Sequence, residues 1–371
     1  MTNKHLHIVT LDTPWPVNYG GVIDLFYKLK ALHKLGIQIH LHCFCKNEVP
    51  QFELNKYCVE VNYYKRNPSF SLTIPYIVNS RKSHLLLQNL NKDNHPILLE
   101  GIHCTYYLFK NQLQNRKVFV RLHNVEFEYY KHLAKNENNI FKRLYFLLES
   151  KLLKKYEASL ANKATFLAVN ENDCNLYQQQ FNAKQISFLP VFIEHEAVQS
   201  KTEKGSYCLY HGNLSINENV KAVEWLLHNV FATLKIPFVV AGKNPSKKLV
   251  KKIHSYTNAC VVENPSQKDM QDLIAKAQIN ILPSFNATGV KLKLINALFV
   301  GKHCISNTAG VVGSGLEKLC HVENTAQEFK NRINQLFAVD ISEQELNRRQ
   351  HTLLKLYNNE DNVKTIIELI S

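Results

Sequence analysis

The chain has 371 residues, of which 45% are hydrophobic and 20% are charged, and its formal net charge is +14. This length favours two domains, and the composition is ordinary for a globular protein with buried cores. The nine cysteines are scattered and odd in number, which argues against a disulfide framework and predicts reduced thiols in a cytoplasmic protein. No apolar run approaches the roughly 20 residues that a membrane-spanning helix needs.

The positive charge is uneven along the chain. Residues 1–190 contain 24 basic and 14 acidic side chains, a net of +10, whereas the remaining residues have a net of +4. A basic first half predicts an anionic partner, which can be a membrane surface, a nucleic acid or a phosphorylated substrate. The alternative is a solvated basic surface that serves solubility.

The chain opens with a strand–helix–strand pattern. Residues 5–11 read as a buried strand, residues 22–35 have helical periodicity, and residues 37–43 read as a second strand. The loop between them lacks the G-x-G-x-x-G fingerprint of a tightly held dinucleotide. Its Gly20 and Gly21 let backbone approach a ligand closely at the start of the helix, although a plain strand–helix turn fits this stretch equally well.

Two later strands of the first half run into histidines. Residues 97–100 lead to His103, and residues 117–122 lead to His123, each with a carboxylate nearby in the sequence. The carboxyl ends of parallel strands are where α/β sheets bind ligands, and a histidine there titrates near neutral pH. We predict a functional role for His123, whereas a structural or solvated role is the stronger interpretation of His103.

Residues 126–160 form a long helical tract that we expect to break near residues 136–139. Basic and aromatic side chains alternate along it, which is typical of a helix that lies on an anionic bilayer. The same pattern also fits a core helix with a charged outer face.

Residues 191–205 are short, polar and charged, and the strand–helix alternation restarts after them. We therefore predict an α/β protein with two Rossmann-like domains, residues 1–190 and 191–340, facing a central cleft. A helical tail at residues 341–371 can pack back on the first domain.

Residues 279–307 carry the clearest ligand signal of the second domain. A short apolar strand is followed by a polar loop, a helix over residues 290–300 that Gly301 ends, and another strand. The loop opens at the carboxyl end of a strand. The helix N-terminus, with Lys291 and Lys293 beside it, can hold a phosphate.

Five segments in order resemble the GT-B glycosyltransferases of family 4, and the resemblance spans almost the whole chain. They are NYGGVIDLFYKLKALHKLG from residue 18, VRLHNVEFEYY from 120, YHGNLSINENVKAVEWLL from 210, VVAGKNPS from 239 and ILPSFNATGVKLKLINALFVGK from 281. Each motif alone is weak, but their order is specific for the fold. The resemblance implies a first domain that binds the acceptor and a second that binds a nucleotide-diphosphate sugar.

The resemblance also implies roles for particular residues. His123 matches the loop histidine at the reaction centre, and we take it as the catalytic candidate. The implied donor-binding residues are Gly20, Gly21, Gly212, Asn213, Lys243, Thr288, Gly289, Val290, Lys291, Lys293 and Asn296. The implied acceptor-binding residues are Tyr19, His103, Arg121 and Glu126.

The chain departs from the family at the two-glutamate motif, whose positions hold Thr288 and Asn296. A neutral hydrogen bond in place of a charge-assisted one costs about 1 kcal/mol or more at each position. A basic residue that many relatives carry shortly after Gly212 is also replaced, since Asn217 and Asn219 stand there. Either the phosphate ligands have moved to other lysines, or donor binding is weak.

The resulting hypothesis is a glycosyltransferase of cell-surface polysaccharide synthesis, with a glycan or lipid-linked acceptor and a possible anionic membrane surface as partners. The resemblance implies retention of anomeric configuration and no obligatory metal, and no Asp-x-Asp triplet is present to hold one. No cofactor is expected besides the nucleotide-diphosphate sugar as co-substrate. Alternatives are a non-catalytic GT-B protein that binds a glycan or a protein, and a nucleotide-sugar epimerase. Nucleic acid is not an expected partner, because the basic residues form no recognisable module.

Overall fold

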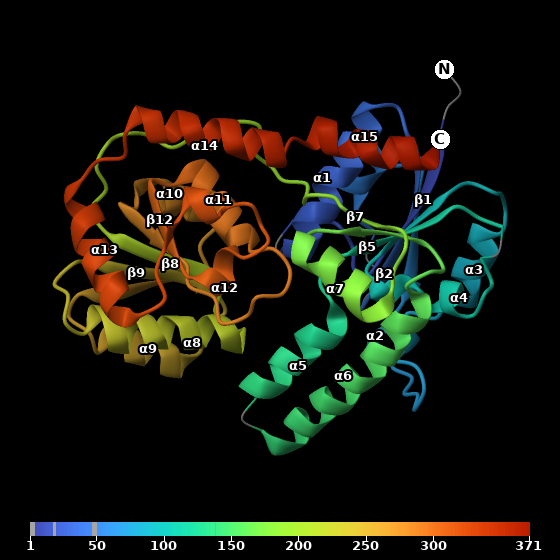
Figure 1. Cartoon of the computed structure of the whole chain (residues 1–371), viewed down its shortest axis with the longest axis horizontal. Helices are drawn as coiled ribbons and strands as arrows, with labels where there is room; N and C mark the ends of the chain where they lie inside the picture. The colour runs from blue at the N-terminus through green and yellow to red at the C-terminus, as the bar shows by residue number, and fades with distance from the viewer. Residues whose placement is uncertain (1–3, 18–19, 47–49, 114, 138) are drawn as a thin grey trace. The chain divides into compact units, whose positions relative to one another are not determined.

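The computed structural model describes residues 4–17, 20–46, 50–113, 115–137 and 139–371. The chain divides into two compact units. Unit 1 comprises Met1–Glu194 and Tyr357–Ser371, and unit 2 comprises His195–Leu356 (Figure 1). The tail that we expected at residues 341–371 is therefore shared between the two units.

Unit 1 is built on a seven-stranded sheet in the order β3-β2-β1-β4-β5-β6-β7, with every neighbouring pair parallel. The strand order reverses between β1 and β4, which makes a topological switch point at the carboxyl ends of the strands. The strands are β1 (His5–Thr10), β2 (Gln38–Cys45), β3 (Glu60–Lys65), β4 (Ile97–Glu100), β5 (Val118–Leu122), β6 (Thr165–Ala168) and β7 (Ile186–Phe188).

The two faces of this sheet carry separate cores, because side chains alternate between faces along each strand. Leu6 and Ile8 pack on one face, while Val9 packs on the other. The C-terminal helix α15 joins the first face, and Val363 lies in the same core as Leu29 of α1. The helices of unit 1 are α1 (Gly20–Lys34), α2 (Tyr76–Asn79), α3 (His84–Leu90), α4 (Tyr106–Phe109), α5 (Glu126–Asn136), α6 (Ile140–Leu160), α7 (Glu171–Phe181) and α15 (Asn359–Ile370).

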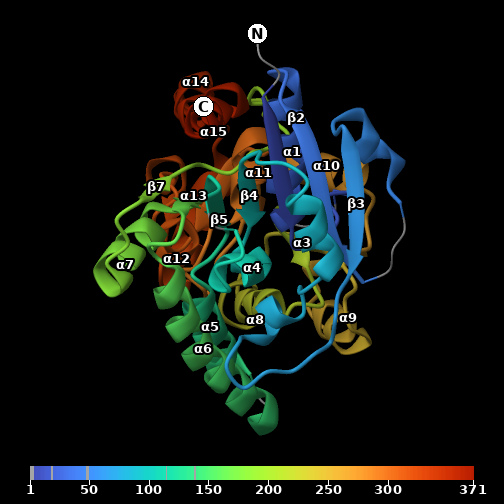
Figure 2. The ribbon, with the colours of Figure 1, turned by 90° about the vertical axis from the view of Figure 1, so that its right-hand side faces the viewer.

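The helical tract of residues 126–160 breaks as predicted, between α5 and α6. Asn139 caps α6, since its side chain accepts hydrogen bonds from the backbone N–H groups of Phe141 and Lys142. The two helices run side by side as a hairpin (Figure 2).

Unit 2 has a six-stranded parallel sheet in the order β10-β9-β8-β11-β12-β13. Its switch point lies between β8 and β11. The strands are β8 (Cys208–Asn213), β9 (Phe238–Lys243), β10 (Ala259–Glu263), β11 (Ile279–Ile281), β12 (His303–Ser306) and β13 (His321–Val322). The helices are α8 (Asn217–Leu226), α9 (Lys247–His254), α10 (Gln267–Lys276), α11 (Leu292–Val300), α12 (Thr308–Val311), α13 (Ala326–Ala338) and α14 (Glu343–Leu356).

A buried arginine ties α14 to unit 2. Arg349 is 2% exposed, and its Nη1 donates to the carbonyl oxygens of Leu298, Gly301 and Lys302 at 2.9–3.3 Å. These carbonyls belong to the end of α11 and the residues after it, where helix carbonyls need outside donors. The boundary between the units therefore falls after α14 and not before it.

Candidate functional site

Five ionisable residues gather at the carboxyl end of the unit 1 sheet. We call them the unit 1 charge cluster: Asp24 and Lys28 on α1, Glu100 at the end of β4, Arg121 on β5, and His123 just beyond β5. The Nζ of Lys28 lies 2.9 Å from Asp24 and 2.6 Å from Glu100. The Nη2 of Arg121 lies 3.2 Å from Asp24. The sheet thus brings together residues far apart in the sequence, such as Asp24 and Arg121, which are 97 positions apart.

The carboxylates of this cluster stay ionised although they are buried. Burial raises the pKa of Asp24, but the charges of Arg121 and Lys28 outweigh it and hold that pKa well below its ordinary value. Burial likewise raises the pKa of Glu100, but Lys28 and the hydrogen bond from His123 outweigh this effect and hold that pKa below its ordinary value. The cluster is a compensated set of charges, as buried ionic groups must be.

His123 is the member of the cluster that solvent reaches, with 15% of its side chain exposed. Its Nε2 lies 3.0 Å from Oε2 of Glu100, and its Nδ1 lies 3.8 Å from Asp24. A carboxylate at hydrogen-bond distance sets the orientation and tautomer of an imidazole. The cluster can therefore present one face of this ring in a defined geometry.

The residues implied as acceptor ligands differ in how far the structure leaves them able to contact a ligand. Tyr19 lies outside the described residues. Arg121 is fully buried and donates to the carbonyls of Leu189 and Pro190, so it supports the cluster and does not present its guanidinium to a ligand. Glu126 is the first residue of α5 and is 5% exposed. Burial and the neighbouring Glu157 raise the pKa of Glu126 to about 8.

His103 is half-buried near the cluster. Its Nδ1 finds no hydrogen-bond partner among the described residues. Burial lowers its pKa well below the ordinary value, and Arg81 and His123 add to the effect. This ring is therefore neutral at physiological pH.

The two glycines implied as donor ligands in unit 1 lie at the start of a helix. Gly20 and Gly21 form the first turn of α1.

In unit 2, the ammonium group of Lys293 is buried at the carboxyl end of the sheet. Its Nζ lies 3.0 Å from the hydroxyl of Tyr210, 3.1 Å from Oδ1 of Asn219, and 4.7 Å from the centre of the Tyr210 ring. Burial lowers its pKa to about 8, with Glu218 opposing the shift and Lys291 adding to it. Sequence reasoning singled out Lys293, but not these partners.

Lys293 places a basic group near the position after Gly212 at which the resemblance implied a basic residue. Asn219 stands on α8, where we noted a neutral residue, and the ammonium of Lys293 reaches it from the start of α11. The ammonium of Lys293 thus lies beside α8, whose residues 217 and 219 are both asparagines.

Two glycines shape the strand ends beside this lysine. A Cβ at Gly242 would lie 1.9 Å from the carbonyl oxygen of Gly212, so only glycine fits there. A Cβ at Gly212 would meet Asn219 at 3.3 Å. Sequence reasoning named Gly212, Asn213 and Lys243 but missed Gly242, whose only signal was the AGK that ends its strand. Lys243 is the exposed last residue of β9.

The side chains at the two positions of the two-glutamate motif, Thr288 and Asn296, form hydrogen bonds within unit 2. The Thr288 hydroxyl donates to Oδ1 of Asn286 at 2.9 Å. Oδ1 of Asn296 lies 2.6 Å from Nε2 of His195 and accepts from Gln271 at 3.3 Å.

The loop between these positions is fixed by backbone contacts. Lys291 donates to the Thr288 carbonyl at 2.7 Å. Gly289 has φ of +63°, which favours glycine, and Val290 is half-buried.

Comparison with known proteins agrees with this architecture. Residues 205–338 match the family model described as Glycosyl transferases group 1. A Klebsiella pneumoniae protein described as "Uncharacterized 44.6 kDa protein in cps region" is 28% identical over 330 residues, covering 83% of this chain and 84% of that protein.

Solved structures match over nearly the full length. Sucrose-phosphate synthase from Thermosynechococcus elongatus has a TM-score of 0.71 at 12% identity, covering 99% of this chain and 98% of that one. A variant of S. aureus TarM in complex with Fondaparinux, alpha-GlcNAc-glycerol and UDP has 0.67 at 11% identity, with 100% of both chains covered. Anabaena HepE in complex with UDP and glucose has 0.66 at 12% identity, with 99% of both covered.

These likenesses confirm the predicted fold. Within the described residues, no helix is long and apolar enough to cross a membrane. Residues 205–338 are thus similar to the group 1 glycosyl transferases, and the whole chain has the two-domain GT-B architecture of the solved structures.

Proposed function

We propose that this protein is a glycosyltransferase that moves a sugar from a nucleotide-diphosphate sugar to a glycan or lipid-linked acceptor during synthesis of a cell-surface polysaccharide. The observation that carries the proposal is the family match over residues 205–338, which contain Lys293 and its partners. The relative in a cps region supports the polysaccharide pathway. The UDP bound to TarM and HepE supports a nucleotide sugar as donor.

The donor diphosphate is proposed to bind at the start of α11. Lys293 supplies a cation held by two neutral acceptors, and Lys291 and Lys243 stand at the same carboxyl end of the unit 2 sheet. Negative charge develops on the diphosphate as the glycosidic bond to the sugar breaks. Fixed cations and backbone N–H groups stabilise that charge because they need little reorganisation.

His123 is proposed to hydrogen-bond the transferred sugar or the acceptor hydroxyl. Glu100 and Asp24 hold its ring from behind, so the imidazole keeps its orientation when substrate arrives. We further propose retention of anomeric configuration and transfer without a metal ion, as the resemblance implied.

An anionic membrane surface is the proposed docking site for the α5–α6 hairpin. The first half of α6 exposes apolar side chains, with Phe141 82% exposed. Basic residues flank them, and an apolar stripe with cationic neighbours suits a bilayer interface. The exposed apolar residues are Ile140, Phe141, Leu144 and Leu148, and the basic ones are Lys142, Arg143, Lys151, Lys154 and Lys155.

The membrane proposal is tested by sedimentation with vesicles of phosphatidylcholine alone or with phosphatidylglycerol. We expect binding to the anionic vesicles only, and a several-fold loss in the double variant Phe141→Asp and Leu148→Asp. Val59→Asp, at another exposed apolar position, is the matched control. Equal binding by the double variant and the control would refute the docking surface.

The donor proposal is tested by thermal-shift and turnover assays with a panel of UDP-, GDP- and ADP-sugars. One donor should raise the melting temperature, since a ligand that binds only the folded state stabilises it. The same donor should be consumed faster when acceptor is added. If no sugar nucleotide binds or reacts, the proposed activity is wrong.

The second candidate is a non-catalytic GT-B protein that binds a glycan or a protein partner. It is favoured by the internal hydrogen bonds of Thr288 and Asn296, which already occupy the side chains at the two motif positions. In that case the panel would give no shift, and glycan or partner binding would persist in Lys293→Met.

A further inference from the structure

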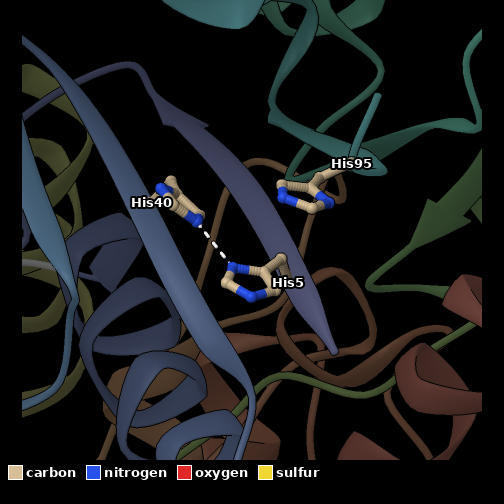
Figure 3. A group of neighbouring side chains, drawn as sticks. All are labelled: His5, His40 and His95. Atoms are coloured by element: carbon tan, nitrogen blue, oxygen red, sulfur yellow. Dashed lines mark hydrogen bonds between the residues drawn. The ribbon is translucent and has the colours of Figure 1, made fainter. Parts of the chain in front are cut away.

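Three histidines gather at the opposite edge of the unit 1 sheet from His123. His5 is the first residue of β1, His40 lies on β2, and His95 lies two residues before β4 begins (Figure 3). Because the strands are parallel, their starts meet at one edge. This amino edge is remote from the ligand-binding end of such a sheet.

The imidazole nitrogens of these residues lie close together. Nδ1 of His5 is 2.9 Å from Nε2 of His40, and one nitrogen from each of the three rings falls within 4.8 Å of the others. Zinc–nitrogen bonds of about 2.0–2.1 Å in a tetrahedral site place two ligand nitrogens roughly 3.4 Å apart. The His95 ring stacks on His5 with centroids 4.4 Å apart, which keeps it beside the other two rings.

The surroundings hold the ligands in place. Oε1 of Glu60 lies 2.8 Å from Nδ1 of His40, which leaves Nε2 of that ring toward His5. A carboxylate on the far nitrogen is the usual outer partner of a metal-binding histidine. The backbone N–H of His95 donates to Asp93 at 2.9 Å, and its carbonyl accepts from Nε of Arg116 at 3.2 Å. The third ligand therefore stands on a fixed loop.

Two further histidines, His7 and His42, lie deeper on the same face and form hydrogen bonds within the protein. Nδ1 of His7 lies 2.9 Å from Nε2 of His42, and the remaining nitrogens lie 3.0 Å from Asp93 and 2.8 Å from the Tyr64 hydroxyl. All four ring nitrogens of this buried pair are thus engaged within the protein. The outer three rings are half-buried and reachable.

We propose that His5, His40 and His95 bind one Zn²⁺ or a similar late first-row divalent ion, with water as the fourth ligand. Three neutral imidazoles suit zinc, copper and nickel and do not suit magnesium or calcium, which prefer oxygen. Such an ion would tie the starts of β1, β2 and β4 together. Its site is separate from the proposed transfer chemistry, so it stands or falls independently of the proposed function.

The test is Zn²⁺ binding by the full-length protein after treatment with a chelator. Calorimetric titration should show one Zn²⁺ per chain, and saturation should raise the melting temperature. His95→Ala should lower the affinity at least 100-fold, and Glu60→Gln should lower it about 10- to 100-fold. His228→Ala, at an exposed histidine of unit 2, should leave it unchanged.

Far-UV circular dichroism and the metal-free melting temperature establish that each variant is folded. If His95→Ala does not fold, His5→Gln takes its place with the same expected loss. The absence of stoichiometric binding by the wild-type protein would overturn the site. Unchanged Zn²⁺ affinity in His5→Gln and His95→Ala would overturn it as well, because the ion would then sit elsewhere, for instance on thiols.

Discussion

The carboxyl ends of the two sheets differ in the partners of their buried cations. In unit 1, Lys28 and Arg121 each lie against a carboxylate at 2.6–3.2 Å. In unit 2, the hydrogen bonds of the Lys293 ammonium go to neutral oxygens of Tyr210 and Asn219. A compensated cluster gains little from an added anion, whereas a desolvated cation with neutral partners gains a great deal. The first arrangement suits positioning of His123, and the second suits binding of a diphosphate.

Removing one carboxylate of the unit 1 charge cluster should have the largest effect. Asp24→Asn leaves Arg121 and Lys28 undercompensated in a buried site, and we expect the free energy of unfolding to fall by about 3 kcal/mol or more. Urea unfolding measures it. Asp361→Asn, which removes an exposed pair with Lys364, is the control and should change stability by less than about 1 kcal/mol. Equal losses in the two variants would contradict the comparison.

Removing the unit 2 cation should affect binding more than stability. In Lys293→Met we expect donor affinity to fall roughly 30- to 100-fold, because a charge-assisted contact to the diphosphate is lost. The free energy of unfolding should change by less than about 1 kcal/mol, since the desolvation cost of the cation is removed together with its hydrogen bonds. Donor titration and urea unfolding give the two values.

Lys247→Met, at the exposed start of α9, is the control for that measurement. It should leave donor affinity within about twofold of wild type. If Lys293→Met binds donor as tightly as this control, the diphosphate site lies elsewhere.

His123→Ala should slow transfer without weakening the donor complex. We expect kcat to fall about 10- to 100-fold, because an oriented hydrogen bond at the reacting sugar or hydroxyl is lost. The melting shift caused by donor should persist, since the proposed diphosphate contacts are in unit 2. His84→Ala, at the exposed start of α3, should keep wild-type turnover. A variant of His123 with normal kcat would remove this residue from the reaction.

The smallest expected effect is the pH dependence of donor affinity. The pKa of Lys293 is lowered to about 8, so its ammonium is protonated below that pH and neutral above it. Because the diphosphate prefers the protonated form, affinity should be highest below pH 8 and fall up to about tenfold by pH 9. Titrations between pH 6.5 and 9 measure this slope. An identical slope in Lys293→Met would assign the titration to another group.

Much of the architecture followed from local pattern. The break before Asn139, the end of α1 before Gly36 with its φ of +79°, and the restart of strand–helix alternation after residue 205 were all legible in the sequence. Each depends on contacts between residues a few positions apart, which periodicity and turn residues record directly. The order of five motifs was enough to predict the GT-B fold.

Some correct predictions had a different cause in the structure. We expected Gly301 to end a helix as the glycine that commonly follows the last helical residue, often in the left-handed conformation. It does follow the end of α11, but with φ of −90°. Glycine is needed there because a Cβ would lie 2.2 Å from Nδ2 of Asn280. That close approach joins segments distant in sequence, so no local pattern could reveal it.

The sequence by itself determined the elements, their order, the resemblance to GT-B proteins and the candidates His123 and Lys293. Only the tertiary structure decided that Asp24, Glu100 and Arg121 surround the former, that Tyr210 and Asn219 hold the latter, and that the tail divides between the units. The reason is physical. Hydrogen-bond periodicity is a property of neighbours along the chain, whereas the compensation of a buried charge depends on distant partners, such as Arg121, which lies 97 positions from Asp24.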